Sequence, residues 1–220
     1  MTWRFERKFL VESILTSKIE YFIQQHPACF SEIYKPRFIN NIYFDTTDLT
    51  CFYENLVGSS DRYKVRIRWY GNLEGYIEKP VLELKIKSGQ LGRKESFPLQ
   101  PFQFKLSDTT KPLSFYLQGT QISEKKTEAL VGFTPALVNR YHRSYYLTLN
   151  KKYRLTLDTK LHYYNPSFSS ILCDYDETSK ILELKYDQHD DNEASYYSSY
   201  FPFNVTKSSK YVMGIERVFQ

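Results

Sequence analysis

The stretch RYKVRIRWY, residues 62–70, alternates between charged or polar and apolar side chains. A period of two residues is typical of a β-strand, because successive side chains point to opposite faces of a sheet. Arg62, Lys64, Arg66 and Arg68 therefore share one face, and the opposite face is aromatic and aliphatic. A fold built on this strand must bury the apolar face and must accommodate four like charges on the other.

The same alternation recurs along the chain. Strands are predicted at residues 5–11, 38–46, 62–70, 81–87, 136–149, 153–161 and 181–186. Helices are predicted at 13–25, 49–54 and 123–131 from helical periodicity and capping residues, and the polar segment 187–195 is predicted to be a loop. Aromatic residues make up 17% of the chain, which fits a strand-dominated α+β fold.

The polar faces of the predicted strands are dominated by Arg and Lys. Besides Arg62 to Arg68, they carry Glu6, Lys8, Glu83, Lys85, Lys87, Arg154, Asp158, Lys160, Glu183 and Lys185. One such face alone is typical of the solvated outside of a sheet. If several of them turn inward in a closed antiparallel barrel, the interior is a basic tunnel that needs a ligand with several negative charges. Carboxylates among the cations would then bind a divalent metal ion that bridges the anion.

Length, charge and cysteine content limit the classes of function. The 220 residues show no low-complexity linker, so a single domain over residues 1–220 is predicted. A net charge of +5 is too small for a chain that coats nucleic acid by bulk charge. The three cysteines are odd in number and widely spaced, so neither a disulfide framework nor a zinc site is indicated, and a reducing, cytoplasmic setting is predicted. No stretch approaches the length of a membrane-spanning helix, and a soluble protein is predicted.

An ordered set of short motifs resembles the VTC domains, the catalytic domains of the vacuolar transporter chaperone polyphosphate polymerases. The motifs are Arg4, Glu6 and Lys8 on the first strand, YFDTTDL (43–49), KVRIRWYG (64–71), LELK (82–85), YHRSYY (141–146), YRLTLDTKL (153–161), ILELKY (181–186) and KSSKY (207–211). This family lies in the CYTH-like superfamily of triphosphate tunnel metalloenzymes. The resemblance implies a closed eight-stranded antiparallel barrel with flanking helices, which forms a basic tunnel for ATP or polyphosphate and uses Mn²⁺ or Mg²⁺.

The resemblance also implies roles for individual residues. The residues expected at the catalytic centre are Arg66, Arg68, Lys85, Arg154 and Glu183. Those expected to bind substrate phosphates are Lys8, Arg62, Lys64, Lys94, Arg143, Lys185, Lys207 and Lys210, with Arg140 as a rival for the place of Arg143. Glu183 is expected to be the metal ligand, and Glu6, Glu83 and Asp158 are further metal or water-organising candidates.

Two positions depart from the pattern of related families. Arg4 stands where the CYTH domains have the first Glu of a Glu-x-Glu-x-Lys motif, which argues against a two-metal hydrolytic site on this strand. Asn55 stands where the eukaryotic polymerases have a basic residue. Arg62 or Lys64 is the candidate to supply that charge.

Three functions are compatible with these features. The first is a metal-dependent polymerase that adds the γ-phosphoryl group of ATP to a polyphosphate chain. The second is hydrolysis of a triphosphate, and the third is a sensor domain that binds polyphosphate or a nucleotide without turnover. The expected partners are ATP, polyphosphate or triphosphate, but not nucleic acid. The resemblance to a membrane-tethered complex also implies a membrane-protein partner that receives the product.

Overall fold

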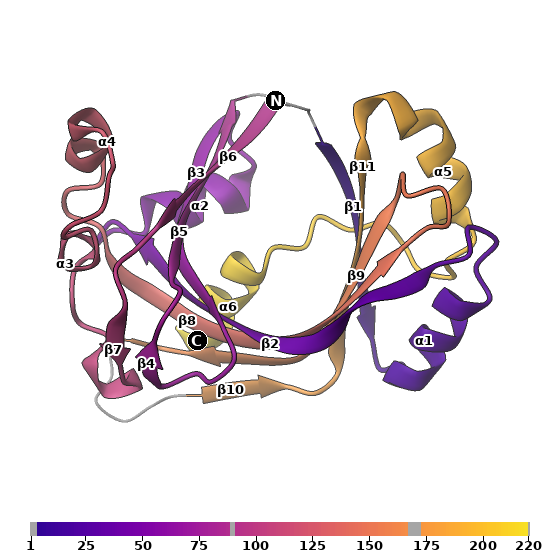
Figure 1. Cartoon of the computed structure of the whole chain (residues 1–220), viewed down its shortest axis with the longest axis horizontal. Coiled ribbons are helices and arrows are strands. Elements are labelled where there is room, and N and C mark those ends of the chain that lie inside the picture. Colours follow the sequence, from indigo (N-terminus) through magenta and orange to yellow (C-terminus); the bar gives the residue numbers. More distant parts are fainter. Residues whose placement is uncertain (1–3, 89–90, 167–172, 220) are drawn as a thin grey trace. The chain divides into compact units, whose positions relative to one another are not determined.

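The computed structural model of the chain describes residues 4–88, 91–166 and 173–219. The chain divides into two compact units, each assembled from segments that are distant in sequence. Unit 1 comprises Met1–Arg37, Tyr141–Leu161 and Tyr175–Ser208, and unit 2 comprises Phe38–Arg140, His162–Asp174 and Ser209–Gln220. Three long strands contribute residues to both units, namely β2 (Ser31–Asp45), β8 (Thr134–Leu147) and β9 (Arg154–Tyr164) (Figure 1).

Unit 1 is built on three antiparallel strands in the order β1 (Arg4–Glu12), β11 (Ser179–Asp187) and β9. The helices α1 (Thr16–Gln24) and α5 (Asp191–Ser199) pack against one face of these strands, and a 3-10 turn, η2 (Gln188–Asp190), leads into α5 (Figure 1). The core between them contains Tyr153, Leu155, Leu157, Leu182, Leu184 and Tyr186. The alternation predicted for the strands at 153–161 and 181–186 is therefore confirmed, because their apolar faces lie in this core.

Unit 2 is built on β3 (Asp61–Tyr70), which pairs with β2 on one side and with β5 (Val81–Ser88) on the other. The strand β6 (Leu91–Pro98) continues the sheet beyond β5. The other elements are α2 (Thr50–Val57), β4 (Gly75–Ile77), β7 (Phe102–Phe104), η1 (Leu106–Asp108), α3 (Leu113–Tyr116), α4 (Glu124–Ala129) and α6 (Lys210–Val218). Val65, Ile67 and Trp69 lie in the core of this unit, as the alternation of β3 predicts.

The main sheet has the strand order β1-β11-β9-β8-β2-β3-β5-β6, and β10 (Cys173–Asp176) pairs with β9 as a ninth strand. The strand-dominated α+β class with flanking helices is confirmed. The closed eight-stranded barrel is not, because no pairing closes this order from β6 back to β1 within residues 4–88, 91–166 and 173–219. Alternation defines the two faces of each strand, but it does not define which edges pair or with what stagger.

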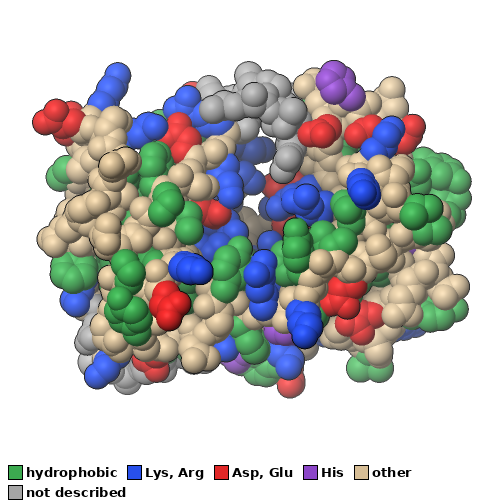
Figure 2. All heavy atoms as spheres, in the orientation of Figure 1, with side chains coloured by type: hydrophobic (Ala, Val, Ile, Leu, Met, Phe, Trp, Pro, Cys, Tyr) green, Lys and Arg blue, Asp and Glu red, His purple; other side chains and the backbone are tan. Residues whose placement is uncertain are grey.

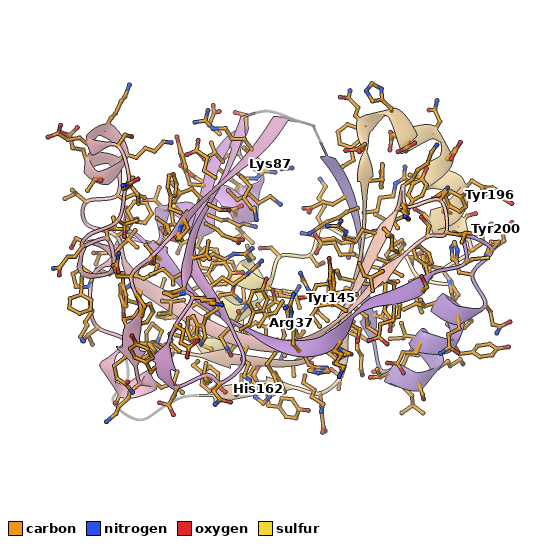
Figure 3. The ribbon with its side chains drawn as sticks, viewed as in Figure 1. Arg37, Lys87, Tyr145, His162, Tyr196 and Tyr200 are labelled. Carbon is orange, nitrogen blue, oxygen red and sulfur yellow. The ribbon has the colours of Figure 1, made fainter. Side chains whose placement is uncertain are left out.

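Helix predictions were less accurate than strand predictions. The three predicted helices are present with shifted ends, as α1, α2 and α4. The loop predicted at 187–195 is wrong, because this segment contains η2 and most of α5. Tyr196 lies on α5 and Tyr200 is its C-cap residue, and their hydroxyl oxygens are 2.6 Å apart (Figure 3). In the part of the chain that the structure describes, no helix is long and apolar enough to cross a membrane.

Candidate functional site

One face of β3, β5 and β6 carries the first group of predicted site residues. We define the β3–β5 cluster as Lys64, Arg66, Arg68, Glu83, Lys85 and Lys94. The register places Arg66 opposite Glu83, and Lys85 lies between Lys64 on β3 and Lys94 on β6. Figure 2 shows Lys and Arg side chains gathered in the region of these strands. Like charges at directly opposed positions destabilise a sheet, so three lysines in one row favour a bound anion at this face.

Glu83 is the carboxylate of the β3–β5 cluster and is 5% exposed. Its Oε2 accepts hydrogen bonds from Arg66 Nε at 2.8 Å and Nη2 at 2.6 Å. Its Oε1 lies 2.8 Å from Lys94 Nζ and 3.5 Å from Arg68 Nη1. Burial opposes the ionisation of Glu83, but the charges of Arg66 and Arg68 outweigh burial and hold its pKa well below the usual range. Because both oxygens are engaged by cations, Glu83 fits an anchor for the arginines better than a metal ligand.

Buried polar side chains from β2 and β8 hold the same arginines, and they were not predicted from the sequence. Arg66 Nη1 donates to Tyr43 Oη at 3.1 Å, and Arg68 Nε donates to Asn41 Oδ1 at 3.1 Å. Asn41 Nδ2 donates in turn to Asn139 Oδ1 at 2.8 Å. The signal that could have found these residues is polar side chains within strands that are otherwise apolar, since buried amides need partners.

The helix α6 brings part of the KSSKY motif to the β3–β5 cluster. Lys64 Nζ donates to the hydroxyl of Ser209, the N-cap residue of α6, at 2.8 Å. Lys210 is the first residue of α6 and is partly buried. Tyr211 stacks on Tyr43 with ring centroids 5.0 Å apart. The Tyr–Tyr contact and the Lys64 hydrogen bond thus place Lys210 at the end of the basic strand.

Arg62 and Asn55 make local contacts instead. Arg62 Nη1 donates to the backbone carbonyl of Gly58 at 3.3 Å, in the turn that follows α2. Asn55 Nδ2 donates to the carbonyl of Cys51 at 2.7 Å, within α2. Arg62 and Lys64 were the two candidates to supply the positive charge that Asn55 lacks. Lys64 lies within the β3–β5 cluster, whereas Arg62 contacts the turn after α2.

The second group of predicted site residues lies in unit 1. We define the β1–β11 cluster as Glu6, Lys8, Arg143, Asp158, Glu183 and Lys185. The register places Glu6 opposite Lys185 and Lys8 opposite Glu183, so that the charges alternate in sign. Lys8 Nζ lies 3.2 Å from Glu6 Oε1, and Lys185 Nζ lies 3.3 Å from Glu183 Oε1. This cluster therefore contains three carboxylates, whereas the β3–β5 cluster contains only Glu83.

Glu183 is 6% exposed and shares a hydrogen bond with the carboxyl group of Glu6. Burial opposes its ionisation, but Lys185 and Lys8, helped by this hydrogen bond, hold the pKa of Glu183 well below its usual range. Two ionised carboxylates in contact repel each other unless a proton or nearby cations offset their charge. Carboxylate oxygens suit hard divalent cations, so the pair would contribute two ligands to Mg²⁺ or Mn²⁺.

Protein side chains alone do not complete such a site. Among residues 4–88, 91–166 and 173–219, no group of three or more His, Cys, Asp or Glu side chains is placed to hold a metal ion. Glu6 and Glu183 are thus the residues that fit the predicted metal, and they fit it as a pair.

Arg143 is the arginine that lies beside Glu183. Its Nη2 donates to Asp158 Oδ2 at 2.6 Å, its Nε donates to Asp158 Oδ1, and Nη2 lies 3.9 Å from Glu183 Oε2. Asp158 is 0% exposed and holds the guanidinium in a bidentate pair, so it positions Arg143. The guanidinium of the rival Arg140 lies over the ring of Phe38, 3.9 Å from its centroid.

The remaining predicted residues of unit 1 lie near the strands of this cluster. Arg154 is opposite Lys185 in the register of β9 and β11 and is exposed. Lys207 is exposed, in a segment that runs along β1, because Thr206 N donates to the carbonyl of Lys8 at 2.7 Å. Lys8 Nζ also lies 3.3 Å from the carbonyl oxygen of Ser208.

The fold and these clusters define a class of protein: a strand-rich domain with basic strand faces suited to oxyanions and a carboxylate pair suited to a hard divalent cation. The VTC domain family profile matches residues 3–219, and the chain belongs to this family. The comparison with curated protein sequences finds no significant match.

Three solved structures share the fold over nearly the whole chain. A Hippeastrum adenylyl cyclase candidate, described as having a dominant triphosphatase activity, is 15% identical with a TM-score of 0.52 and covers 97% of this chain and 96% of its own. The PH1819 protein of Pyrococcus horikoshii is 11% identical with a TM-score of 0.51, and the match covers 97% of this chain and 99% of the PH1819 chain. An adenylate cyclase candidate of Bacillus halodurans is 16% identical with a TM-score of 0.50, and the match covers 100% of this chain and 98% of the Bacillus chain. At these identities the likeness concerns the fold.

Proposed function

We propose that this chain is a metal-dependent polyphosphate polymerase, which transfers the γ-phosphoryl group of ATP to a polyphosphate chain. The observation that carries the proposal is the β3–β5 cluster, in which five cations share a strand face with one carboxylate and three of them contact it. Membership of the VTC domain family supports it. Phosphoryl transfer depends mainly on positioning the phosphates and on stabilising the charge that develops on them.

The cations of the β3–β5 cluster bind phosphate oxygens in this proposal. Arg66 and Arg68 are held by Glu83, Tyr43 and Asn41 before any ligand arrives, so little reorganisation is needed on binding. The three lysines of the cluster, together with Lys210 on α6, add positive charge for further phosphates. Glu83 keeps the arginines in place.

The β1–β11 cluster is the proposed metal-binding cluster of unit 1. When bound, Mg²⁺ or Mn²⁺ would neutralise charge on the phosphate oxygens. Glu183 and Glu6 would hold it. Lys8 and Lys185 keep Glu183 ionised, and Arg143 presents its remaining donors to a phosphate. Arg154 and Lys207 are proposed as further phosphate-binding residues.

Triphosphate hydrolysis is the second candidate function. Thr156 lies opposite Glu183 in the strand register, and its buried hydroxyl has no hydrogen-bond partner among the described residues. A hydroxyl in this position can orient a water molecule. The dominant triphosphatase activity described for the Hippeastrum protein, which shares the fold, agrees with this candidate.

Product analysis separates these functions. We expect purified protein incubated with ATP and Mn²⁺ to form polyphosphate chains that are visible on a gel. Glu183→Gln should abolish them, whereas Glu12→Gln, at an exposed position of the neighbouring strand β1, should not. Release of phosphate without polyphosphate would favour hydrolysis. If the protein binds tripolyphosphate but forms no polyphosphate and releases no phosphate, the result would contradict an enzyme and favour a sensor domain.

A further inference from the structure

Two buried asparagines in unit 2 connect Arg68 to a hydrogen-bond donor that has no acceptor. Asn41 is 0% exposed and Asn139 is 1% exposed. Arg68 Nε donates to Asn41 Oδ1, and Asn41 Nδ2 donates to Asn139 Oδ1. Within the described parts of the chain, nothing accepts a hydrogen bond from Asn139 Nδ2, and this atom is itself buried.

The chemistry of Arg68 fixes the direction of this relay. A guanidinium group has only donors, so Asn41 must turn its oxygen toward Arg68 and its amide nitrogen toward Asn139. Asn139 must then turn its own oxygen toward Asn41. Exchanging oxygen and nitrogen in either side chain would place a donor against a donor. The free donor on Asn139 is therefore a consequence of the arginine.

The relay belongs to the face that carries the β3–β5 cluster. Asn41 lies directly opposite Arg68 in the register of β2 and β3. Tyr43, two residues further along β2, shares its face and accepts a hydrogen bond from Arg66. Asn139 is one side chain removed from Arg68. Buried polar groups are nearly always paired with the protein or with ordered water, so the open donor of Asn139 leaves a hydrogen-bonding position that an acceptor oxygen can fill.

We propose that Asn139 Nδ2 donates a hydrogen bond to an oxygen of the anion that Arg68 binds, which makes Asn139 a further binding residue of the β3–β5 cluster. The identity of the anion, a phosphoanhydride chain, rests on the proposed function. Its oxygens are acceptors, as both Arg68 and the amide require. The amide carries no charge, so it selects for an acceptor oxygen without adding to the electrostatic attraction.

Nuclear magnetic resonance tests this directly on the unmodified chain. We expect the side-chain NH₂ resonances of Asn139 and the Nε–H resonance of Arg68, assigned with Asn139→Leu and Arg68→Lys, to shift together as tripolyphosphate is added. A shift of Arg68 alone would mean that water serves the amide, and it would overturn this inference while leaving the proposed function intact. If neither resonance shifts and no tripolyphosphate binds, both are overturned.

Affinity provides a second test with a matched control. Asn139→Leu should weaken tripolyphosphate binding about tenfold, because a hydrogen bond to a charged acceptor is lost. Asn40→Leu removes a neighbouring buried asparagine that points to the opposite face of β2 and donates to the carbonyls of Gly71 and Asn72. Its affinity should equal that of the unmodified chain. Equal affinities for all three proteins, or equal losses in both variants, would overturn the inference.

Discussion

Two buried carboxylates, Glu83 and Asp158, fix the arginines beside them. Each accepts hydrogen bonds from Nε and Nη2 of one arginine, Arg66 for Glu83 and Arg143 for Asp158. The pair with Asp158 is bidentate, with one donor on each carboxylate oxygen, whereas both donors of Arg66 meet Oε2 of Glu83. Two hydrogen bonds in either arrangement fix the orientation of the guanidinium as well as its position. The remaining donors of each arginine are thereby aimed before a phosphate binds, which is what a positioning enzyme requires.

Replacing Glu83 with Gln should test this anchoring role. The variant leaves Arg66, Arg68 and Lys94 around a neutral acceptor, so we expect the free energy of unfolding to fall by about 2 kcal/mol. Saturating tripolyphosphate should restore part of that loss, because the anion replaces the missing charge. Urea denaturation with and without tripolyphosphate measures both effects.

Glu95→Gln is the control for Glu83→Gln. Glu95 pairs with Arg93 and Lys126 at a more exposed position, where 19% of its side chain is accessible. Its substitution should cost less than about 1 kcal/mol and should be insensitive to tripolyphosphate. The same loss in both variants would speak against a special role for Glu83.

His26 gives the stability of unit 1 a pH dependence. It is 4% exposed, accepts a hydrogen bond at Nδ1 from Ala28 N at 3.1 Å, and has Nε2 2.9 Å from the carbonyl oxygen of Tyr197. Burial lowers its pKa below the ordinary 6.5. The unfolded chain therefore binds a proton first as the pH falls, so the contribution of His26 is complete above pH 6.5 and decreases below it.

The size of this effect can be measured by urea denaturation between about pH 5 and pH 7. We expect His26 to contribute a slope of at most about 1.4 kcal/mol per pH unit. His26→Gln keeps a hydrogen-bonding side chain but cannot titrate, so the slope should decrease. An unchanged slope would show that His26 does not titrate differently in the two states.

At the scale of elements, seven strands were predictable, namely β1, β2, β3, β5, β8, β9 and β11. The strands β4, β6, β7 and β10 and the helices α3, α5 and α6 were not predicted. The segment of α5 buries only Ala194 and Ser198 and has no apolar stripe, so its sequence resembles a polar loop. The segment of α6 buries Tyr211, Gly214, Ile215 and Val218 at helical spacing, but a glycine in mid-helix usually argues against a helix. Both helices form because of contacts with strands distant in sequence, which a local pattern cannot contain.

For the candidate site, the charged residues of single strands were predictable from the sequence, but the contacts between strands were not. Alternation places Arg66 and Arg68 on one face of β3 and Glu83 on the polar face of β5, so the cluster could be assembled from single strands. The roles of Asn41, Asn139 and Tyr43 could not, because they depend on the pairing of β2 with β3 and on the position of β8. Strand register, which single sequences do not specify, determines which charges meet.

Gly214 is the residue on which the docking of α6 depends. A Cβ atom at this position would lie 2.4 Å from Leu137 Cδ2 and 2.7 Å from Tyr163 Cδ1. We therefore expect Gly214→Ala to lower the free energy of unfolding by about 2 kcal/mol through overpacking, although alanine favours helices. Thermal and urea denaturation measure this loss. Glu216→Ala, at an exposed position of the same helix, should be nearly neutral, and equal stabilities of the two variants would contradict the close approach.

At the scale of the whole molecule, each unit combines its own apolar core with its own charged cluster. The β3–β5 cluster has an excess of cations, and the β1–β11 cluster has carboxylates paired with cations. Because the net charge of the chain is only +5, affinity for a polyanion must come from these local groups. We therefore propose that each of the two clusters binds phosphate groups.

Calorimetric titration with tripolyphosphate tests that claim most directly. The comparison uses Lys85→Gln and Lys185→Gln, one in each cluster, and the exposed controls Lys79→Gln and Lys151→Gln, which remove the same charge. We predict binding that weakens as salt is raised, a loss of affinity of about tenfold in each cluster variant, and little change in the controls. Absence of binding, or equal losses in cluster and control variants, would contradict the account.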